Sequence, residues 1–162
     1  MSVARHRIVA GAILLLGTLG LAAVGRMVVL DTPEIAQIRG RLNGQWVATR
    51  VQAAEHNIAD GAEAARTSVE FAGSSVRLQG LIGGGNAEGV CVIETPGNPG
   101  KVDFKVDAGW LRGIYSLQGD RLTLCVNALK LPEQLGVPTR GYPDGLQQSP
   151  GRHLYEFQRV TP

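Results

Sequence analysis

The side chains that could act as nucleophiles, bases or metal ligands are few and scattered in this sequence. The chain holds two cysteines, Cys91 and Cys125, and three histidines. A thiol paired with a histidine can form a nucleophilic site, and His153 could serve either cysteine. The histidines lack the spacing of a metal site, and His6 belongs to a basic N-terminal stretch. A sparse cysteine–histidine enzyme is therefore the third of three functional hypotheses.

Acidic residues and glycines add no catalytic pattern. We expect four acidic residues on solvent-exposed faces or in turns: Glu88, Asp103, Asp107 and Asp120. In such places they would not form the paired carboxylates of an acid–base site. Residues 83–85 are three glycines that precede an apolar strand, whereas phosphate loops precede a helix, so we expect a turn there. The sequence thus predicts no catalytic residue, no cofactor and no metal.

The N-terminus is typical of a targeting segment. Arg5 and Arg7 precede residues 8–25, a run of 18 residues without a charge. This run is long enough for a short membrane span, while the small residues Ala23 and Gly25 also suit cleavage after position 25. A retained membrane anchor and a cleaved signal peptide both stay open. In either case the basic residues hold the N-terminus in the cytoplasm, and the remainder is exported to the periplasm or beyond.

Charge excludes one class of partner. The chain has 16 basic and 14 acidic residues, and cleavage after position 25 removes two arginines and no acid, which leaves 14 of each. A neutral domain offers no electrostatic footprint for nucleic acid. We therefore divide the chain into a targeting segment, 1–30, and one globular domain, 31–162.

Residues 31–162 predict an all-β fold with a short helix at its start. Residues 31–42 carry a capping residue, an early proline and apolar positions at helical spacing. After them the apolar period changes to two, and 22 glycines and 8 prolines supply turns. The expected strands are 45–52, 67–72, 75–82, 89–95, 101–106, two within 113–126, and 153–160. Eight consecutive strands without helices between them favour an antiparallel up-and-down barrel, because closure leaves no exposed edge.

Two segments interrupt this series of strands. Residues 53–66 are polar and alanine-rich and predict a loop, with or without a helical turn, and the proline-rich segment 127–152 is long enough to be either functional or mobile. Large side chains are expected to fill the barrel interior: Trp46, Phe71, Leu78, Phe104, Tyr115, Leu117, Leu122, Leu124, Tyr155 and Phe157. On the first strand, Trp46 and Ala48 should face one way and Val51 the other.

The segment 113–126 predicts a hairpin with a two-residue turn at Gly119-Asp120. Glycine tolerates the positive φ of such turns, and the register pairs Gln118 with Arg121. Tyr115 then shares the inner face with the leucines, and Cys125 lies on the other face. Two strands separate Cys91 from Cys125 in an up-and-down order, so we expect both thiols to be free.

The first strand opens with Gly44-Gln-Trp46, a pattern typical of lipocalin-like barrels. In those barrels the tryptophan closes one end, and an arginine near the last strand packs over it. Arg159 lies at the matching place, and a guanidinium stacked on an indole contributes about 0.5–2 kcal/mol.

These motifs together resemble a lipocalin-like domain family of unknown function that is abundant in planctomycete-type bacteria. Its landmarks are L-x-G-x-W, present as Leu42–Trp46, the G-I-Y-x-L-x-G-D-x-L-x-L-C run, present as Gly113–Cys125, and a final arginine, present as Arg159. The family's R-P-T-E-F is replaced by residues 137–141. The resemblance implies a lipocalin-like barrel in an exported setting and no known reaction. From these patterns we expect structural roles for six residues: Gly44, Trp46, Tyr115, Gly119, Asp120 and Arg159.

Two non-enzymatic hypotheses rank above the hypothesis of a cysteine–histidine enzyme. The first is an exported domain that binds a small apolar ligand or a protein partner. The second is a structural or interaction module of the cell envelope whose barrel is filled. The size of the interior side chains favours a packed interior or a shallow pocket over a deep ligand cavity. A membrane contact is expected only through residues 8–25, if that segment is retained.

Overall fold

The computed structural model describes residues 31–53, 58–82, 85–107, 109–127, 141–147 and 151–161. The predicted targeting segment, His56 and most of the proline-rich segment lie outside these ranges. Within them, no helix combines the length and the apolar character that crossing a bilayer requires.

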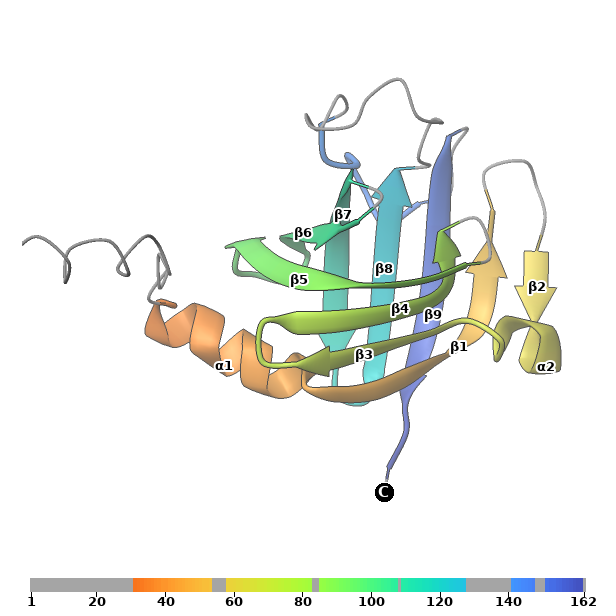
Figure 1. Ribbon diagram of the computed structural model, residues 1–162, viewed down its shortest axis with the longest axis horizontal. Helices are drawn as coiled ribbons and strands as arrows, with labels where there is room; N and C mark the ends of the chain where they lie inside the picture. Colours follow the sequence, from red (N-terminus) through yellow and green to blue (C-terminus); the bar gives the residue numbers. More distant parts are fainter. Residues whose placement is uncertain are drawn as a thin grey trace, which may run out of the picture. The chain divides into compact units, whose positions relative to one another are not determined.

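Nine strands and two helices follow one another along the described chain (Figure 1). The helices are α1 (Pro33–Leu42) and α2 (Gly61–Ala64). The strands are β1 (Gly44–Gln52), β2 (Ile58–Asp60), β3 (Ser68–Ala72), β4 (Ser75–Ile82), β5 (Gly85–Thr95), β6 (Gly100–Val106), β7 (Gly109–Gln118), β8 (Arg121–Asn127) and β9 (Arg152–Arg159).

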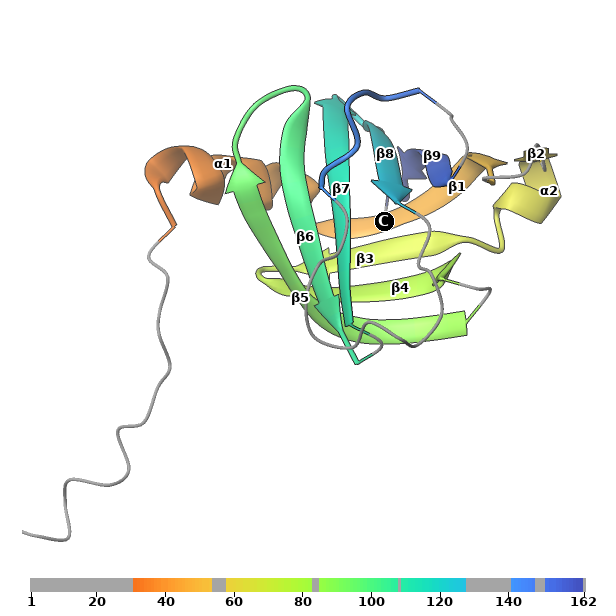
Figure 2. The same ribbon diagram turned by 90° about the horizontal axis from the view of Figure 1, so that it is seen from above.

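All strand pairings are antiparallel, and the sheet closes on itself. The order is β2-β1-β3-β4-β5-β6-β7-β8-β9, and β9 also pairs with β1 from Trp46↔Arg159 to Gln52↔Leu154. The ring therefore contains eight strands, with β2 attached to the side of β1. The strands wrap around a common interior in the view from above (Figure 2). The predicted antiparallel eight-stranded barrel is confirmed.

The strand β2 lies in the segment that was expected to be a loop. Residues Gly44–Val47 of β1 pair with β3, and Arg50–Gln52 pair with β2, which continues the same edge. Three residues are too few to show a period of two, so the sequence pattern could not reveal this strand. The strands β5 and β7 also begin earlier than expected, at Gly85 and Gly109, because glycine-rich starts carry little β propensity.

A bulge in β1 corrects the expected direction of Val51. The register with β9 shifts between Ala48 and Arg50, so one extra residue is inserted there. After such a bulge the alternation of side chains is inverted. Trp46 and Ala48 face the core as expected, but Val51 packs against the core as well. The prediction that Val51 lies on the opposite face is wrong.

The barrel interior is occupied by large side chains. All ten residues predicted to fill it are buried and belong to one hydrophobic cluster. The Tyr155 hydroxyl on β9 donates a 2.7 Å hydrogen bond to the Leu81 carbonyl on β4, which lies across the ring. A single side chain thus reaches from one wall of the barrel to another, and the core around it is continuous.

The hairpin between β7 and β8 has the expected register and faces. Gln118 pairs with Arg121, and Gly119 has a φ of +58°, the left-handed conformation that favours glycine. Tyr115 and the leucines of both strands face the core, whereas Ile114 and Cys125 belong to a separate outer cluster.

The helix α1 packs at the end of the barrel where β1 begins. Thr32 caps the helix, because its hydroxyl accepts a hydrogen bond from the Ile35 amide at 3.3 Å. Ile38 and Leu42 are buried in the core cluster. Arg39 donates to the Cys91 carbonyl on β5 at 3.2 Å, so the helix is bound to the strand ends as well as to the core.

Candidate functional site

Trp46 and Arg159 lie together where α1 ends and β1 begins. The Arg159 Cζ lies 4.2 Å from the centre of the Trp46 ring. The Trp46 Nε1–H donates to the Leu42 carbonyl at 2.7 Å, and the Arg159 guanidinium donates to the carbonyls of Asn43 and Arg41. These three carbonyls end a helix and have no partner within it. The pair therefore binds the end of α1 to the barrel wall.

The other four residues of the predicted structural set lie near the same end. Gly44 has a φ of +114°, and a Cβ there would lie 3.3 Å from Arg159 Nη1. The Asp120 carboxylate, in the turn after Gly119, is 3.2 Å from Arg159 Nε. Tyr115 packs over Gly100, where a Cβ would lie 2.6 Å from its ring and hydroxyl. These positions suit structural roles, with no reacting group brought to the pair.

The cysteines are both free and buried, on opposite sides of the barrel wall. Cys91 belongs to the interior cluster, and burial raises the pKa of its thiol to about 12. Cys125 faces outward, and burial raises the pKa of its thiol as well. A thiol with a raised pKa is a poor nucleophile at neutral pH.

The structure does not join Cys125 to His153. In the β8–β9 ladder, Cys125 is opposite Leu154 and Val126 is opposite His153. His153 therefore lies on the inner side with Val126 and stacks on Tyr155, with ring centres 6.2 Å apart. Burial lowers the pKa of His153, so the imidazole is neutral at pH 7. The two groups lie on opposite faces of the wall.

A short segment that sequence reasoning missed covers the outer face of the barrel. We call Gly141–Gln147 the outer segment; it lies beside β7 (Figure 2, blue). Its Tyr142 and Leu146 pack on three buried residues of the wall, Ile114, Cys125 and Leu154. This cluster is separate from the barrel interior.

Next to this cluster lies a group of four polar and charged side chains that we call the Asp103 cluster: Lys101, Asp103, Arg112 and Tyr142. Asp103 and Arg112 are directly opposite in the β6–β7 ladder, with 3.7 Å between Oδ2 and Nε. The Tyr142 ring lies against two cations, 5.0 Å from Lys101 Nζ and 5.2 Å from Arg112 Cζ. A lysine and an arginine therefore both lie within cation–π distance of one aromatic ring from the outer segment.

The expectation that Asp103 is exposed to solvent is wrong. The residue is 3% exposed, although it lies on the outer face of the wall. Alternation along β6 correctly gave its face, but the covering residue, Tyr142, comes from the proline-rich segment far along the chain. A sequence pattern in β6 alone could not show this. The other three acidic residues, Glu88, Asp107 and Asp120, are exposed as expected.

Burial is the largest influence on the pKa values of Asp103 and Tyr142 in this cluster. It raises the pKa of the Asp103 carboxyl, while hydrogen bonding with Tyr142 and the charge of Arg112 act in the opposite direction. Burial and the nearby carboxylate raise the pKa of the Tyr142 hydroxyl far above its usual range. Asp103 Oδ1 and Arg112 Nε are buried and have no hydrogen-bond partner. Perturbed and incompletely paired groups of this kind are typical of functional sites.

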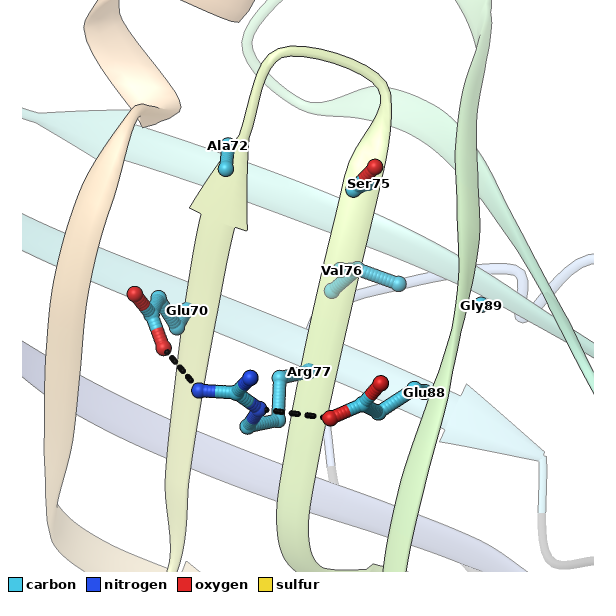
Figure 3. A pocket seen from close by; sticks show the side chains of 7 residues that line it. All are labelled: Glu70, Ala72, Ser75, Val76, Arg77, Glu88 and Gly89. Carbon is cyan, nitrogen blue, oxygen red and sulfur yellow. Dashed lines mark hydrogen bonds and ion pairs between the residues drawn. The ribbon is translucent and has the colours of Figure 1, made fainter.

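A shallow depression of about 250 Å³ lies on the opposite wall, on the outer face of β3, β4 and β5 (Figure 3). Arg77 crosses it, with Glu70 at 3.0 Å on one side and Glu88 at 2.9 Å on the other. All three side chains are exposed, and exposed ion pairs of this type contribute little to stability. The depression has small residues and paired charges, which supply neither a nucleophile nor an unpaired ligand group.

Metal chemistry gains no support from the described part of the chain. There, no group of three or more histidine, cysteine, aspartate or glutamate side chains comes close enough to hold a metal ion. The Asp103 cluster combines one carboxylate with two cations and a tyrosine, a set suited to binding polar and aromatic groups.

Comparisons with known proteins add no relative. No family model matches the chain, and neither a curated protein nor a solved structure matches it.

Proposed function

We propose that this protein is an exported, non-catalytic, lipocalin-like domain that binds a protein partner on its outer surface. The observation that carries the proposal is the filled interior. Six large side chains in the core are less than 2% exposed: Trp46, Leu78, Phe104, Leu122, Leu124 and Tyr155. When side chains fill the interior of a barrel, the outer wall is the surface that remains for recognition of a partner.

The lipocalin-like assignment is supported by the arrangement at the α1 end. The pattern Gly44-x-Trp46 lies at the start of β1, and Arg159 stacks on the indole from the last strand. This is the combination that the sequence resemblance implied. It accounts for the closed end of the barrel and assigns no reaction to it.

Native mass spectrometry of the domain purified from its own host tests the filled barrel. We expect the mass of the chain alone, and no fluorescence increase when 1-anilinonaphthalene-8-sulfonate is added. Leu122→Ala is the matched control, because removing a buried leucine leaves a cavity that an apolar probe can enter. A small molecule retained by the wild-type protein and released on unfolding would contradict the proposal and support an internal ligand site.

Export is tested separately. We expect cell fractionation to place the protein outside the cytoplasm, and N-terminal sequencing to distinguish cleavage after Gly25 from a retained anchor. Full-length protein found soluble in the cytoplasm would contradict export.

A further inference from the structure

The outer face beneath the outer segment has the features of a peptide-binding surface. Its floor is apolar and buried, formed by Ile114, Cys125 and Leu154. At one side of the floor, Lys101 and Arg112 both contact one aromatic ring. An apolar floor next to a few fixed polar groups is the usual composition of a recognition site.

The outer segment fits this face incompletely. Asp103 Oδ1 and Arg112 Nε are buried without hydrogen-bond partners, and Asp103 is almost fully buried. Buried polar groups are normally paired, because an unpaired one keeps the cost of desolvation without compensation. One atom is an acceptor and the other is a donor. An extended residue directs its own N–H donor and C=O acceptor to the same side, so a suitably placed backbone would satisfy both atoms.

The contacts that hold the outer segment are of a kind that another segment could replace. Within the described residues, the outer segment joins no strand of the barrel. Its contacts include side-chain packing, an ion pair between Asp144 and Arg152, and a 2.6 Å hydrogen bond from the Asn127 amide to the Gly141 carbonyl. Tyr142 adds its hydrogen bond with Asp103, and the Cys125 thiol lies 4.0 Å from the Gln147 carbonyl oxygen. Because the segment belongs to the same chain, its contact with the wall is intramolecular, and this advantage compensates for an imperfect fit.

We propose that the outer face of β6–β9 binds an extended peptide segment of a partner protein through an aromatic side chain, at the place that Tyr142 occupies within this chain. This inference rests on the proposed function and specifies its partner. The aromatic ring contacts Lys101 and Arg112, its hydroxyl or edge faces Asp103, and a neighbouring extended residue donates its N–H to Asp103 Oδ1 and accepts from Arg112 Nε with its C=O. The outer segment acts as a tethered competitor for the partner.

The test uses the full chain with Tyr142→Ala and a labelled synthetic peptide of residues 141–147, followed by fluorescence anisotropy up to millimolar concentrations. We expect saturable binding that is at least about tenfold stronger to the variant than to the wild-type chain, since the tethered competitor has lost its anchor. A peptide with alanine in place of its tyrosine should bind about tenfold more weakly or not at all. Adding Arg112→Ala should weaken binding, whereas adding Arg77→Ala, on the opposite wall, should leave it unchanged.

Equal binding to the variant and the wild-type chain, or equal binding of the tyrosine and alanine peptides, would overturn the inference. If Tyr142→Ala does not fold, the wild-type chain gives the answer. Excess tyrosine peptide should displace the outer segment and so increase the rate at which an added protease cleaves the chain within residues 141–147, and an unchanged rate would overturn the inference. Native mass spectrometry tests the filled barrel independently, so a failure here would leave the proposed function standing.

Discussion

Two arginines on this barrel each contact an aromatic ring and an aspartate, but they differ in whether their remaining hydrogen-bond donors are satisfied. Arg159 stacks on Trp46 at 4.2 Å and lies 3.2 Å from Asp120, and Arg112 stacks on Tyr142 at 5.2 Å and lies 3.7 Å from Asp103. Arg159 also donates to two carbonyls at the end of α1, whereas Arg112 Nε has no hydrogen-bond partner. The first aromatic ring belongs to the core, and the second comes from a segment outside it.

This difference separates a structural contact from a replaceable one. At the α1 end, the arginine, the indole and the helix carbonyls satisfy one another, so every group depends on the others. At the Asp103 cluster, two buried polar atoms have no hydrogen-bond partner while the aromatic ring is in place. We infer that the first site stabilises the fold and that the second is available for recognition.

The largest effect is expected for Trp46→Ala. The substitution removes the largest fully buried side chain, the stack with Arg159 and the hydrogen bond to Leu42. We expect a loss of about 3–5 kcal/mol in the free energy of unfolding, measured by denaturant titration. Trp110→Ala is the control, because that ring is partly exposed on the outer wall, and it should cost about 1 kcal/mol or less. A midpoint for Trp46→Ala equal to that of the wild type would show that the indole does not close the barrel.

The conservative pair Arg159→Lys and Arg112→Lys compares the two arginines directly. A lysine has one ammonium group and cannot stack on the ring while donating to two separate carbonyls. Arg159→Lys should therefore cost roughly 1.5–3 kcal/mol of unfolding free energy. Arg112→Lys keeps the charge beside Asp103 and should cost less than Arg159→Lys. Equal losses in the two variants would remove the distinction between the two sites.

The pH dependence of stability should reveal Asp103. Burial raises its pKa in the folded chain, so the folded state binds this proton more tightly than the unfolded state does. The stability linked to the proton is complete below the unfolded pKa of about 3.9 and is lost as pH rises through the higher folded pKa. The stability difference between wild type and Asp103→Asn should therefore fall as pH rises through this acidic range. A difference that rises with pH would show that the carboxylate is stabilised by its partners instead.

The smallest effect is expected for Arg77→Ala. Its two ion pairs, with Glu70 and Glu88, lie on an exposed wall, where solvent screens the charges. The unfolding midpoint should match that of the wild type within experimental error. A clear decrease would mean that the charged row across β3, β4 and β5 contributes to the fold in the same way as the α1 end does.

The barrel could be predicted from the sequence because its strands and turns are specified by residues that are close together in the chain. The turn at Gly119-Asp120 fixed the register of one hairpin, and alternation along each strand identified the inner face. The bulge in β1 was not predicted, because an inserted residue inverts the alternation of side chains without leaving a marker in the sequence. The strand β2 was not predicted, because three residues inside a polar segment show no period of two.

The Asp103 cluster could not be predicted because its parts come from distant positions. Asp103 and Arg112 look like ordinary outward residues of two strands, and Tyr142 looks like part of a proline-rich loop. Only the fold brings the loop onto the wall. Tyr142 is the single aromatic residue among residues 127–152, and this was the local sign that this part of the loop packs against something.

Cysteine alkylation in the native wild-type protein, measured across low denaturant concentrations, tests the central claim most directly. Cys125 lies beneath the outer segment and Cys91 lies inside the barrel, so each thiol reports on one region. If the outer segment detaches while the barrel stays folded, Cys125 is alkylated faster than Cys91, and low denaturant hardly changes its rate. The rate of Cys91 should rise steeply with denaturant, because only global unfolding exposes it. Equal rates with the same steep dependence would contradict the account, since the outer segment would then be as permanent as the core.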